Sequence, residues 1–293
     1  MQSIKKNRDD LLFQILVNLF LISLLAVMVL PLWRVFVMSI TPLNYIDTQT
    51  YGMWLNPSMW SFEAYKQLLS HPSFLRATTN SFIITFGGTT INMLLTVPLA
   101  YALSNRRLPG RKFFITLILI PFLFNAGMIP TYLVVQKFDL VDTFWAVILP
   151  GGINITNLLI MKNFFEGLPD ELEEAAYLDG ANEIQVLFRV VLPLAKPILL
   201  TIGLFYMVGH WNEFFSAILY LNDAKLQPLP VLLRNILLAA NINEYVEYDA
   251  FSNASIQAIK AASVFLTMLP MVIIYPWIQH YFTKGTLLGG VKE

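Results

Sequence analysis

Long apolar runs separated by short polar stretches dominate the pattern of hydrophobic positions along the chain. A helix needs roughly 20 mostly apolar residues to cross the hydrocarbon core of a bilayer. Six stretches reach this length, at about residues 11–33, 81–103, 113–135, 143–165, 194–221 and 261–282. Backbone polar groups in lipid must be bonded within their own segment, which favours helices here. The pattern therefore predicts an all-α, polytopic membrane helical bundle with six transmembrane helices.

The composition supports a membrane protein. Hydrophobic residues make up 56% of the 293 residues and charged residues only 13%, whereas a soluble domain carries about 25% charged residues. The formal net charge is +0, so nothing indicates a nucleic-acid partner, and the absence of cysteine excludes disulfides and thiolate chemistry. The first apolar run is longer than the core of a signal peptide and no cleavage site follows it, which indicates a retained span.

Basic residues set the expected orientation. The short loop SNRRLPGRKFF, between the second and third expected spans, carries four of them. Cytoplasmic loops are enriched in Lys and Arg, so this loop and both termini are predicted to be cytoplasmic. The stretch between the fourth and fifth spans then also faces the cytoplasm, while residues 34–80 and 221–260 form outside loops.

The acidic segment ELEEAAYLDGAN, residues 171–182, is the least membrane-like part of that cytoplasmic stretch. Two capping-box-like patterns, Asp170 with Glu173 and Asn182 with Gln185, flank Gly180 and predict two short helices joined by a glycine turn. In the second helix an apolar face is expected with i, i+3, i+4, i+7 spacing, formed by Ile184, Leu187, Phe188 and Val191.

Two interpretations of this segment are open from the residues alone. It is either an amphipathic loop at the lipid headgroups or an element that docks on another protein. A helix on the membrane surface normally presents Lys and Arg to anionic lipids, whereas this segment presents carboxylates. The acidity therefore favours a protein partner with basic residues.

The motif EAAYLDGA resembles the EAA loop of ABC-importer permeases. The stretches NSFIITFGGTTINMLLTVPLAYALSNRRLPGRKFF, LPLAKPILLTIGLFYMVGHWNEFFSAILY and YPWIQHYFTKGTLLGGVKE are similar to the second span, the fifth span and the tail of the family's sugar-transporting branch. The last of these stretches resembles the tails of the group that includes the maltose permease subunit of the G type. GMIPTYLVV and LPDELEEAAYLDGA are similar to a narrower subgroup for complex oligosaccharides, including fragments of pectin and of the acidic polysaccharide alginate.

This resemblance implies a type I ABC importer permease fold and a function. Residues 1–293 would form a single permease domain, with core spans at about 80–283, a cytoplasmic coupling loop at 168–193 and a cytoplasmic tail at 284–293. The subunit would lie in the bacterial inner membrane as part of a heterodimer with a second homologous permease subunit. An extracytoplasmic solute-binding protein would deliver an oligosaccharide, and two ABC ATPase subunits would bind ATP and Mg. The residues implied in ATPase coupling are Glu171, Glu174, Ala175, Ala176, Asp179, Gly180 and Ala181.

Polar residues inside the expected spans are candidates for the transport pathway. Glu213 is the one carboxylate deep in a span, and it follows Trp211 and Asn212. Aromatic, amide and carboxylate groups together suit a sugar, but an intramembrane carboxylate can also bond to another helix. Asn92 and Asn154 are further candidates, although such side chains also join helices. Both interpretations remain open.

No pattern in the chain indicates catalysis. Gly285 and Gly290 have the glycine spacing of a phosphate-binding loop, but Val291 stands where that loop needs Lys. The three histidines are scattered, and neither HExxH nor GxSxG occurs. We therefore expect a non-enzymatic subunit with no catalytic residue, metal site or cofactor of its own. The alternative is a polytopic membrane enzyme or scaffold without transport activity.

Overall fold

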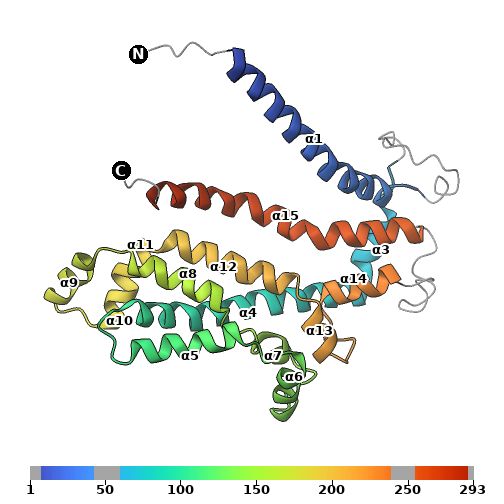
Figure 1. The fold of residues 1–293 in the computed structure, drawn as a ribbon. Coiled ribbons are helices and arrows are strands. Elements are labelled where there is room, and N and C mark those ends of the chain that lie inside the picture. The colour runs from blue at the N-terminus through green and yellow to red at the C-terminus, as the bar shows by residue number, and fades with distance from the viewer. Residues whose placement is uncertain (1–7, 43–59, 239–254, 290–293) are drawn as a thin grey trace. The chain divides into compact units, whose positions relative to one another are not determined.

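The computed structural model describes residues 8–42, 60–238 and 255–289, and these parts contain helices and no strand (Figure 1). This confirms the predicted all-α class. In chain order the elements are α1 (Arg8–Ser39), α3 (Glu63–Ser70), α4 (Pro72–Ser104), α5 (Arg111–Leu123), α6 (Met128–Lys137), α7 (Phe144–Ile148), α8 (Ile155–Glu166), α9 (Asp170–Leu178), α10 (Glu183–Val186), a π-helical turn (Leu187–Val191), α11 (Leu192–Leu194), α12 (Lys196–Trp211), α13 (Phe215–Tyr220), α14 (Leu229–Leu238) and α15 (Ile256–Gly289).

Three helices of the described chain are long and apolar enough to cross a membrane by themselves. They correspond to Leu12–Ser39, Pro72–Ser104 and Ile256–Ile274, which match the first, second and last expected spans. Two bent pairs raise the number to as many as five if each pair forms one span. One pair is α5 with α6, bent by 114°, and the other is Glu183–Leu194 with α12, bent by 85°. The count of six spans stays a prediction.

The prediction of a continuous helix at 113–135 is wrong, because α5 and α6 are separated by a turn. Gly127 adopts a φ of +86°, and its N–H donates to the side-chain oxygen of Asn125 at 2.8 Å. This Asx turn gives the backbone an alternative to helical bonding, and glycine supplies the positive φ without a steric penalty.

The predicted fourth span is likewise broken, into α7 and α8, by residues 149–154. The predicted fifth span divides into α12 and α13 around Asn212–Phe214. In both places side chains provide the backbone partners that a continuous helix would have supplied, as described below. The structure thus contains breaks inside the third, fourth and fifth expected spans that the sequence analysis did not predict.

The chain divides into two compact units, which are described separately. Unit 1 consists of residues 1–71 and 235–267, and unit 2 consists of residues 72–234 and 268–293. In unit 1 the Ser39 hydroxyl shares a hydrogen bond with the Tyr65 hydroxyl at 2.5 Å. The ring of Phe265 lies 5.3 Å from that of Phe36 and 6.4 Å from that of Tyr65. Aromatic contacts therefore join α1, α3 and the first part of α15.

Unit 2 is built around α4, which packs along both α8 and α12 (Figure 1). The three helices, with α5, α10 and the π-helical turn, enclose an apolar core. Its fully or nearly fully buried members include Ala100, Leu158, Met161, Val186, Val191 and Ile202. This core lies beside the predicted coupling loop and gives that loop a rigid support.

Candidate functional site

The acidic segment forms the two short helices predicted, α9 and α10, with Gly180 between them. Gly180 has a φ of +83°, and its N–H donates to the carbonyl of Tyr177 at 3.0 Å. The N–H of Ala181 donates to the carbonyl of Ala176, also at 3.0 Å. This pair of bonds is the Schellman arrangement, which closes a helix through a left-handed residue.

The second capping box is confirmed and the first is wrong. Asn182 Oδ1 accepts from the N–H of Gln185 at 2.9 Å, and Gln185 Oε1 accepts from the N–H of Asn182 at 3.0 Å. Asp170, by contrast, is the first helical residue of α9, and Pro169 occupies the cap position without a side-chain acceptor. Because Asp170 is itself helical, its carboxylate is not placed to cap the helix. It still lies at the positive end of the α9 dipole.

The apolar face expected in the second helix is only half correct. Leu187 and Val191 are buried in the core of unit 2, together with Val186. Ile184 and Phe188 are 68% and 63% exposed. The apolar stripe is therefore wider than the surface that the bundle covers, and the π-helical turn at Leu187–Val191 changes the angular spacing along it. The sequence thus predicted which residues form the apolar stripe, but not which of them are buried.

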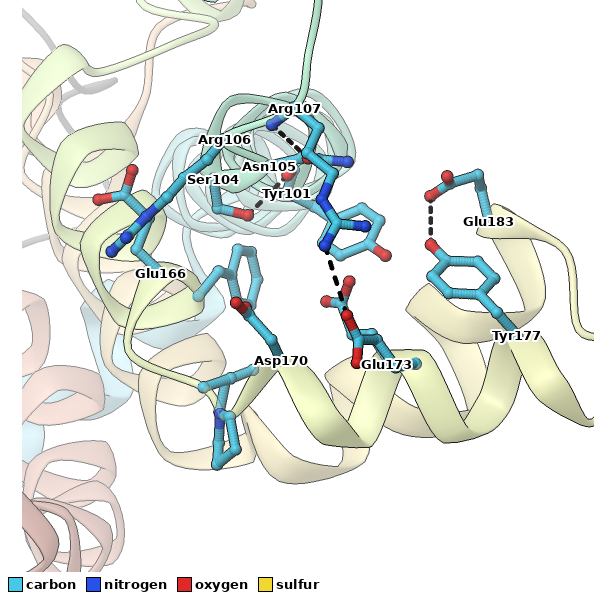
Figure 2. A pocket seen from close by; sticks show the side chains of 14 residues that line it. Tyr101, Ser104, Asn105, Arg106, Arg107, Glu166, Asp170, Glu173, Tyr177 and Glu183 are labelled. Atoms are coloured by element: carbon cyan, nitrogen blue, oxygen red, sulfur yellow. Dashed lines mark hydrogen bonds and ion pairs between the residues drawn. The ribbon is translucent and has the colours of Figure 1, made fainter.

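A cleft of about 330 Å³ lies between α9 and the turn that follows α4 (Figure 2). Glu173 and Glu183 line it on the acidic side, and the Tyr177 hydroxyl donates to Glu183 at 2.8 Å. Burial raises the pKa of Glu173, and the nearby charges of Glu183 and Asp170 raise it further. The carboxylates thus repel one another in the isolated chain, and a cation entering the cleft would relieve that repulsion.

Two basic residues, Arg106 and Arg107, line this cleft, and Arg107 forms an ion pair there. Its guanidinium lies 3.4 Å from the carboxylate of Glu174, with side chains that are 86% and 58% exposed (Figure 2). An ion pair so open to solvent contributes little to stability. Glu174 therefore remains accessible for exchange with a basic group of another protein.

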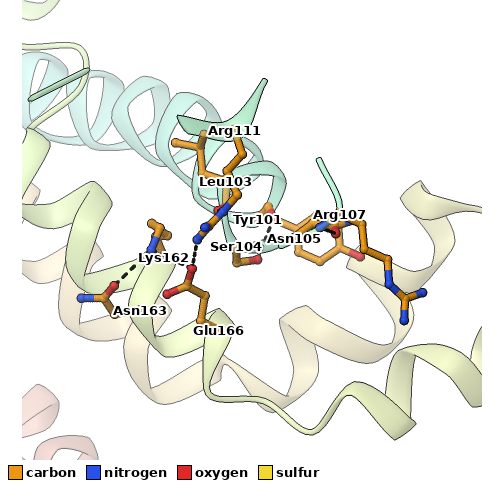
Figure 3. Close-up of polar contacts among 9 residues, drawn as sticks. All are labelled: Tyr101, Leu103, Ser104, Asn105, Arg107, Arg111, Lys162, Asn163 and Glu166. Carbon is orange, nitrogen blue, oxygen red and sulfur yellow. Dashed lines mark hydrogen bonds and ion pairs between the residues drawn. The ribbon is translucent and has the colours of Figure 1, made fainter. Parts of the chain in front are cut away.

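A more buried ion-pair cluster lies where the end of α4, the start of α5 and the end of α8 meet (Figure 3). Glu166 accepts from Arg111 and, at 2.8 Å, from Lys162, while Arg111 Nε donates to the carbonyl of Leu103 at 2.8 Å. Although burial acts to raise it, the hydrogen bond and charge of Lys162, with the charge of Arg111, lower the pKa of Glu166.

The sequence analysis missed this cluster. The i, i+4 spacing of Lys162 and Glu166 was a visible signal for a helical ion pair, whereas the contribution of Arg111 depends on tertiary packing. The cluster joins the end of α8, just before the predicted coupling loop, to α4 and α5.

The predicted coupling residues divide between the surface and the core of unit 2. Ala176 and Ala181 are partly buried and pack against that core. The other predicted members are exposed, namely Glu171, Glu174, Ala175, Asp179 and Gly180. The accessible face of α9 is therefore acidic, and Ala176 lies on its inner side.

The predicted pathway residues at the end of α12 make internal contacts. Glu213 Oε1 accepts from the N–H of Ser216 at 3.0 Å, in the first turn of α13. Asn212 is exposed and its amide donates to the carbonyl of Val208 at 2.9 Å. Trp211 is buried, with its ring 5.3 Å from that of Phe82. Their role in a sugar pathway stays a prediction.

Asn92, from α4, and Asn154, before α8, both form hydrogen bonds at the break between α7 and α8. The Asn92 amide nitrogen donates to the carbonyl of Gly151 at 2.7 Å, and its oxygen lies 2.9 Å from His210 Nε2. Asn154 caps α8 by accepting from the N–H of Asn157 at 3.1 Å. In the part of the chain that the structure describes, no group of His, Asp and Glu side chains is arranged to hold a metal ion.

Comparison with known proteins agrees with this architecture. Residues 11–287 match the family described as "Binding-protein-dependent transport system inner membrane component". Protein LplC of Bacillus subtilis (strain 168) is 44% identical over 80% of both chains. The "Polygalacturonan/rhamnogalacturonan transport system permease protein YtcP" of the same organism is 39% identical over 98% of this chain and 99% of its own.

A solved structure is also similar. It is described as the "Crystal structure of a bacterial ABC transporter involved in the import of the acidic polysaccharide alginate". One of its chains superposes with a TM-score of 0.89 at 33% sequence identity, covering 96% of this chain and all (100%) of that one.

A bundle of apolar helices with an exposed acidic loop, matched by this family and this structure, is the architecture of a membrane permease subunit. The chain belongs to the binding-protein-dependent transport system inner membrane components. It is the membrane-embedded, non-catalytic component of an ABC importer, a system that also requires a binding protein and an ATPase.

Proposed function

We propose that this subunit translocates an oligosaccharide, of an acidic kind such as a fragment of alginate or pectin, across the bacterial inner membrane. The cargo of the similar proteins supports this substrate class, because YtcP is named for polygalacturonan and rhamnogalacturonan and the similar structure for alginate. A second, homologous permease subunit completes the pathway, a solute-binding protein delivers the sugar, and two ATPase subunits dock on the cytoplasmic side. Both termini face the cytoplasm.

The observation that carries the proposal is the unsatisfied surface of the coupling loop. Glu173, Glu174 and Glu183 line one cleft, where burial, followed by the charges of Glu183 and Asp170, raises the pKa of Glu173. Beside them large apolar side chains are left in solvent, with Leu178 90% exposed and Ile184 68% exposed. Apolar side chains that face water on a packed cytoplasmic element favour a protein interface. A partner with basic residues around an apolar cleft would satisfy both features.

Coupling then follows from how the loop is connected to the bundle. When ATP brings the two ATPase subunits together, the docked loop moves with them. Val186 and Val191 anchor the loop in the core of unit 2, so α4, α8 and α12 follow. ATP can bias the permease only through a difference in affinity between its inward-facing and outward-facing states.

The assembled complex in lipid provides the test. Its ATPase activity is measured with the binding protein and either uronic-acid oligosaccharides or neutral oligosaccharides of equal length. We expect stimulation by the acidic set and little by the neutral set. Stimulation by neutral sugars alone would overturn the substrate class, and no stimulation by any oligosaccharide would overturn carbohydrate transport itself.

A further inference from the structure

Two polar contacts join α4 to α12 in the middle of the bundle. Asn92 contacts His210, with 2.9 Å between Oδ1 and Nε2, and one turn further along the Thr96 hydroxyl lies 2.8 Å from the Tyr206 hydroxyl. The two contacts are four residues apart on each helix, and the residue numbers rise on α4 where they fall on α12, so the two helices are antiparallel. Asn92 is 1% exposed and Thr96 is 0% exposed. We call these four side chains the Asn92 cluster.

The Asn92 cluster also holds the break between α7 and α8. The carbonyl of Gly151 accepts from the Asn92 amide at 2.7 Å, and the N–H of Asn154 donates to the Tyr206 hydroxyl at 3.0 Å. Non-helical backbone inside a membrane protein is tolerated only where such groups have partners. Both helices that flank α8 therefore contribute one bond to the backbone at its start.

The hydrogen bonds of Asn92 determine whether His210 donates or accepts. Because the Asn92 nitrogen donates to Gly151, the Asn92 oxygen must be the acceptor for the imidazole. His210 therefore carries its proton on Nε2, and the ring donates to α4. A side chain that cannot donate from this position would leave the Asn92 oxygen without its partner.

Gly88 is required for this approach of the ring. A Cβ atom on Gly88 would lie 2.5 Å from His210 Nε2 and 2.7 Å from Cε1, which is far inside van der Waals contact. The preceding residue, Gly87, has no atom within 4 Å of the position of such a Cβ. Only one of the two adjacent glycines is therefore constrained by packing.

We propose that Gly88, Asn92 and His210 are positioning residues that hold the α7–α8 break against α4 and α12, so that the three helices move as one block during transport. At its other end α8 is fixed to α4 and α5 through Glu166 and Arg111. Motion of the coupling loop thus reaches α4 and α12 through a helix that is held at both ends. In this assignment Asn92 acts on the protein backbone and does not contact the sugar. The inference rests on the proposed transport function.

The test is a double-mutant cycle in the assembled transporter, with Gly88→Ala, His210→Ala, both together, and Gly87→Ala as the matched control. We expect Gly88→Ala to lower the maximal transport rate by at least about tenfold. The sugar concentration at half-maximal rate should not change, because no group that touches the sugar is altered. Gly87→Ala should stay within about twofold of the wild type, and Gly88→Ala should cost nothing further in the His210→Ala background.

Each contrary result overturns the assignment. Equal effects of Gly87→Ala and Gly88→Ala would show that the Gly88–His210 contact is irrelevant. A changed half-saturating concentration or sugar selectivity in Asn92→Leu would place Asn92 in the pathway instead. If Gly88→Ala fails to assemble, adding His210→Ala must restore assembly, and a double variant that also fails contradicts the proposal. Failure of the transport function is distinct, because wild-type complex would then show no sugar uptake.

Discussion

Gly180 controls the direction in which the chain leaves α9, because it supplies the left-handed turn that the Schellman bonds require. Nothing lies within 4 Å of a Cβ built at this position, so a substitution there is strained by its φ and not by crowding. A β-branched residue in the left-handed region is a severe outlier, whereas Asn enters that region readily.

Gly180→Val should therefore uncouple ATP hydrolysis from transport, because α10 no longer follows α9 at the docking angle. We expect a loss of transport of about tenfold or more, corresponding to the 1–2 kcal/mol cost of a left-handed residue. Gly180→Asn is the matched control and should retain most of the transport. Normal transport by Gly180→Val, measured in vesicles with the assembled complex, would contradict the proposed turn.

The lowered pKa of Glu166 predicts how the stability of the fold depends on pH. Its pKa is lowered in the folded chain, so it stabilises the fold at pH values above the usual pKa of a glutamate. That stabilisation is lost as the pH falls through the lowered pKa, when the carboxylate is protonated. Replacing Glu166 with Gln should remove roughly 1.5–3 kcal/mol of stability at neutral pH, the range for hydrogen bonds to a charged group.

Thermal unfolding of the detergent-solubilised chain between about pH 7 and pH 4 measures this effect. The difference in melting temperature between wild type and Glu166→Gln should be largest at neutral pH and should shrink on acidification. Glu171→Gln, which changes an exposed carboxylate on α9, serves as the control and should change little. A difference that grows on acidification would refute the assigned ion pairs.

At the scale of whole elements, the coupling loop is predicted to bind its ATPase through charge as well as apolar contact. Its carboxylates Glu173 and Glu174 line one cleft, and binding between exposed charges weakens with salt over a Debye length of about 8–10 Å. Neutralising both, as Glu173→Gln with Glu174→Gln, should weaken ATPase binding and flatten its dependence on salt.

Titration of the ATPase against the solubilised permease at several salt concentrations checks this prediction. Glu63→Gln, which neutralises one carboxylate on α3 in a predicted outside loop, is the control and should leave binding unchanged. Identical salt dependence in wild type and double variant would mean that these carboxylates do not meet basic residues.

The elements also show what the sequence could and could not predict. The acidic segment was predicted well because its turn and its second cap depend on nearby residues, as in Gly180 and the Asn182–Gln185 box. The breaks at Gly127 and Gly151 were missed. At Gly151 the reason is that the hydrogen bond comes from Asn92, which is 59 residues away. No pattern in the sequence near Gly151 predicts this bond.

Exposure was harder to predict than helicity. Ile184 and Phe188 have the same apolar character as Leu187 and Val191, yet only the second pair is buried. Which part of an apolar stripe is covered depends on the width of the neighbouring helices, and the exposed remainder is the part available to another protein. The contacts of Glu213 with the start of α13 likewise required the structure.

At the scale of the whole molecule, the functions needed for import lie on different chains. This subunit supplies the membrane passage and the loop that receives movement, and it belongs to a family that acts with a binding protein and an ATPase. The Glu166 ion pairs and the Asn92 cluster fix the two ends of α8. Under the proposed function, movement of a docked ATPase would reach α4 and α12 through α8.

Co-purification tests this central claim most directly. The tagged chain, extracted in mild detergent from cells that make the complete transporter, is isolated and analysed for bound ABC ATPase and for ATP hydrolysis. The account predicts that wild-type chain retains the ATPase, and that a charge-reversed loop, Glu173→Lys with Glu174→Lys, loses both the ATPase and the activity. ATP hydrolysis or sugar turnover by the isolated chain, with no ATPase bound to it, would contradict the account.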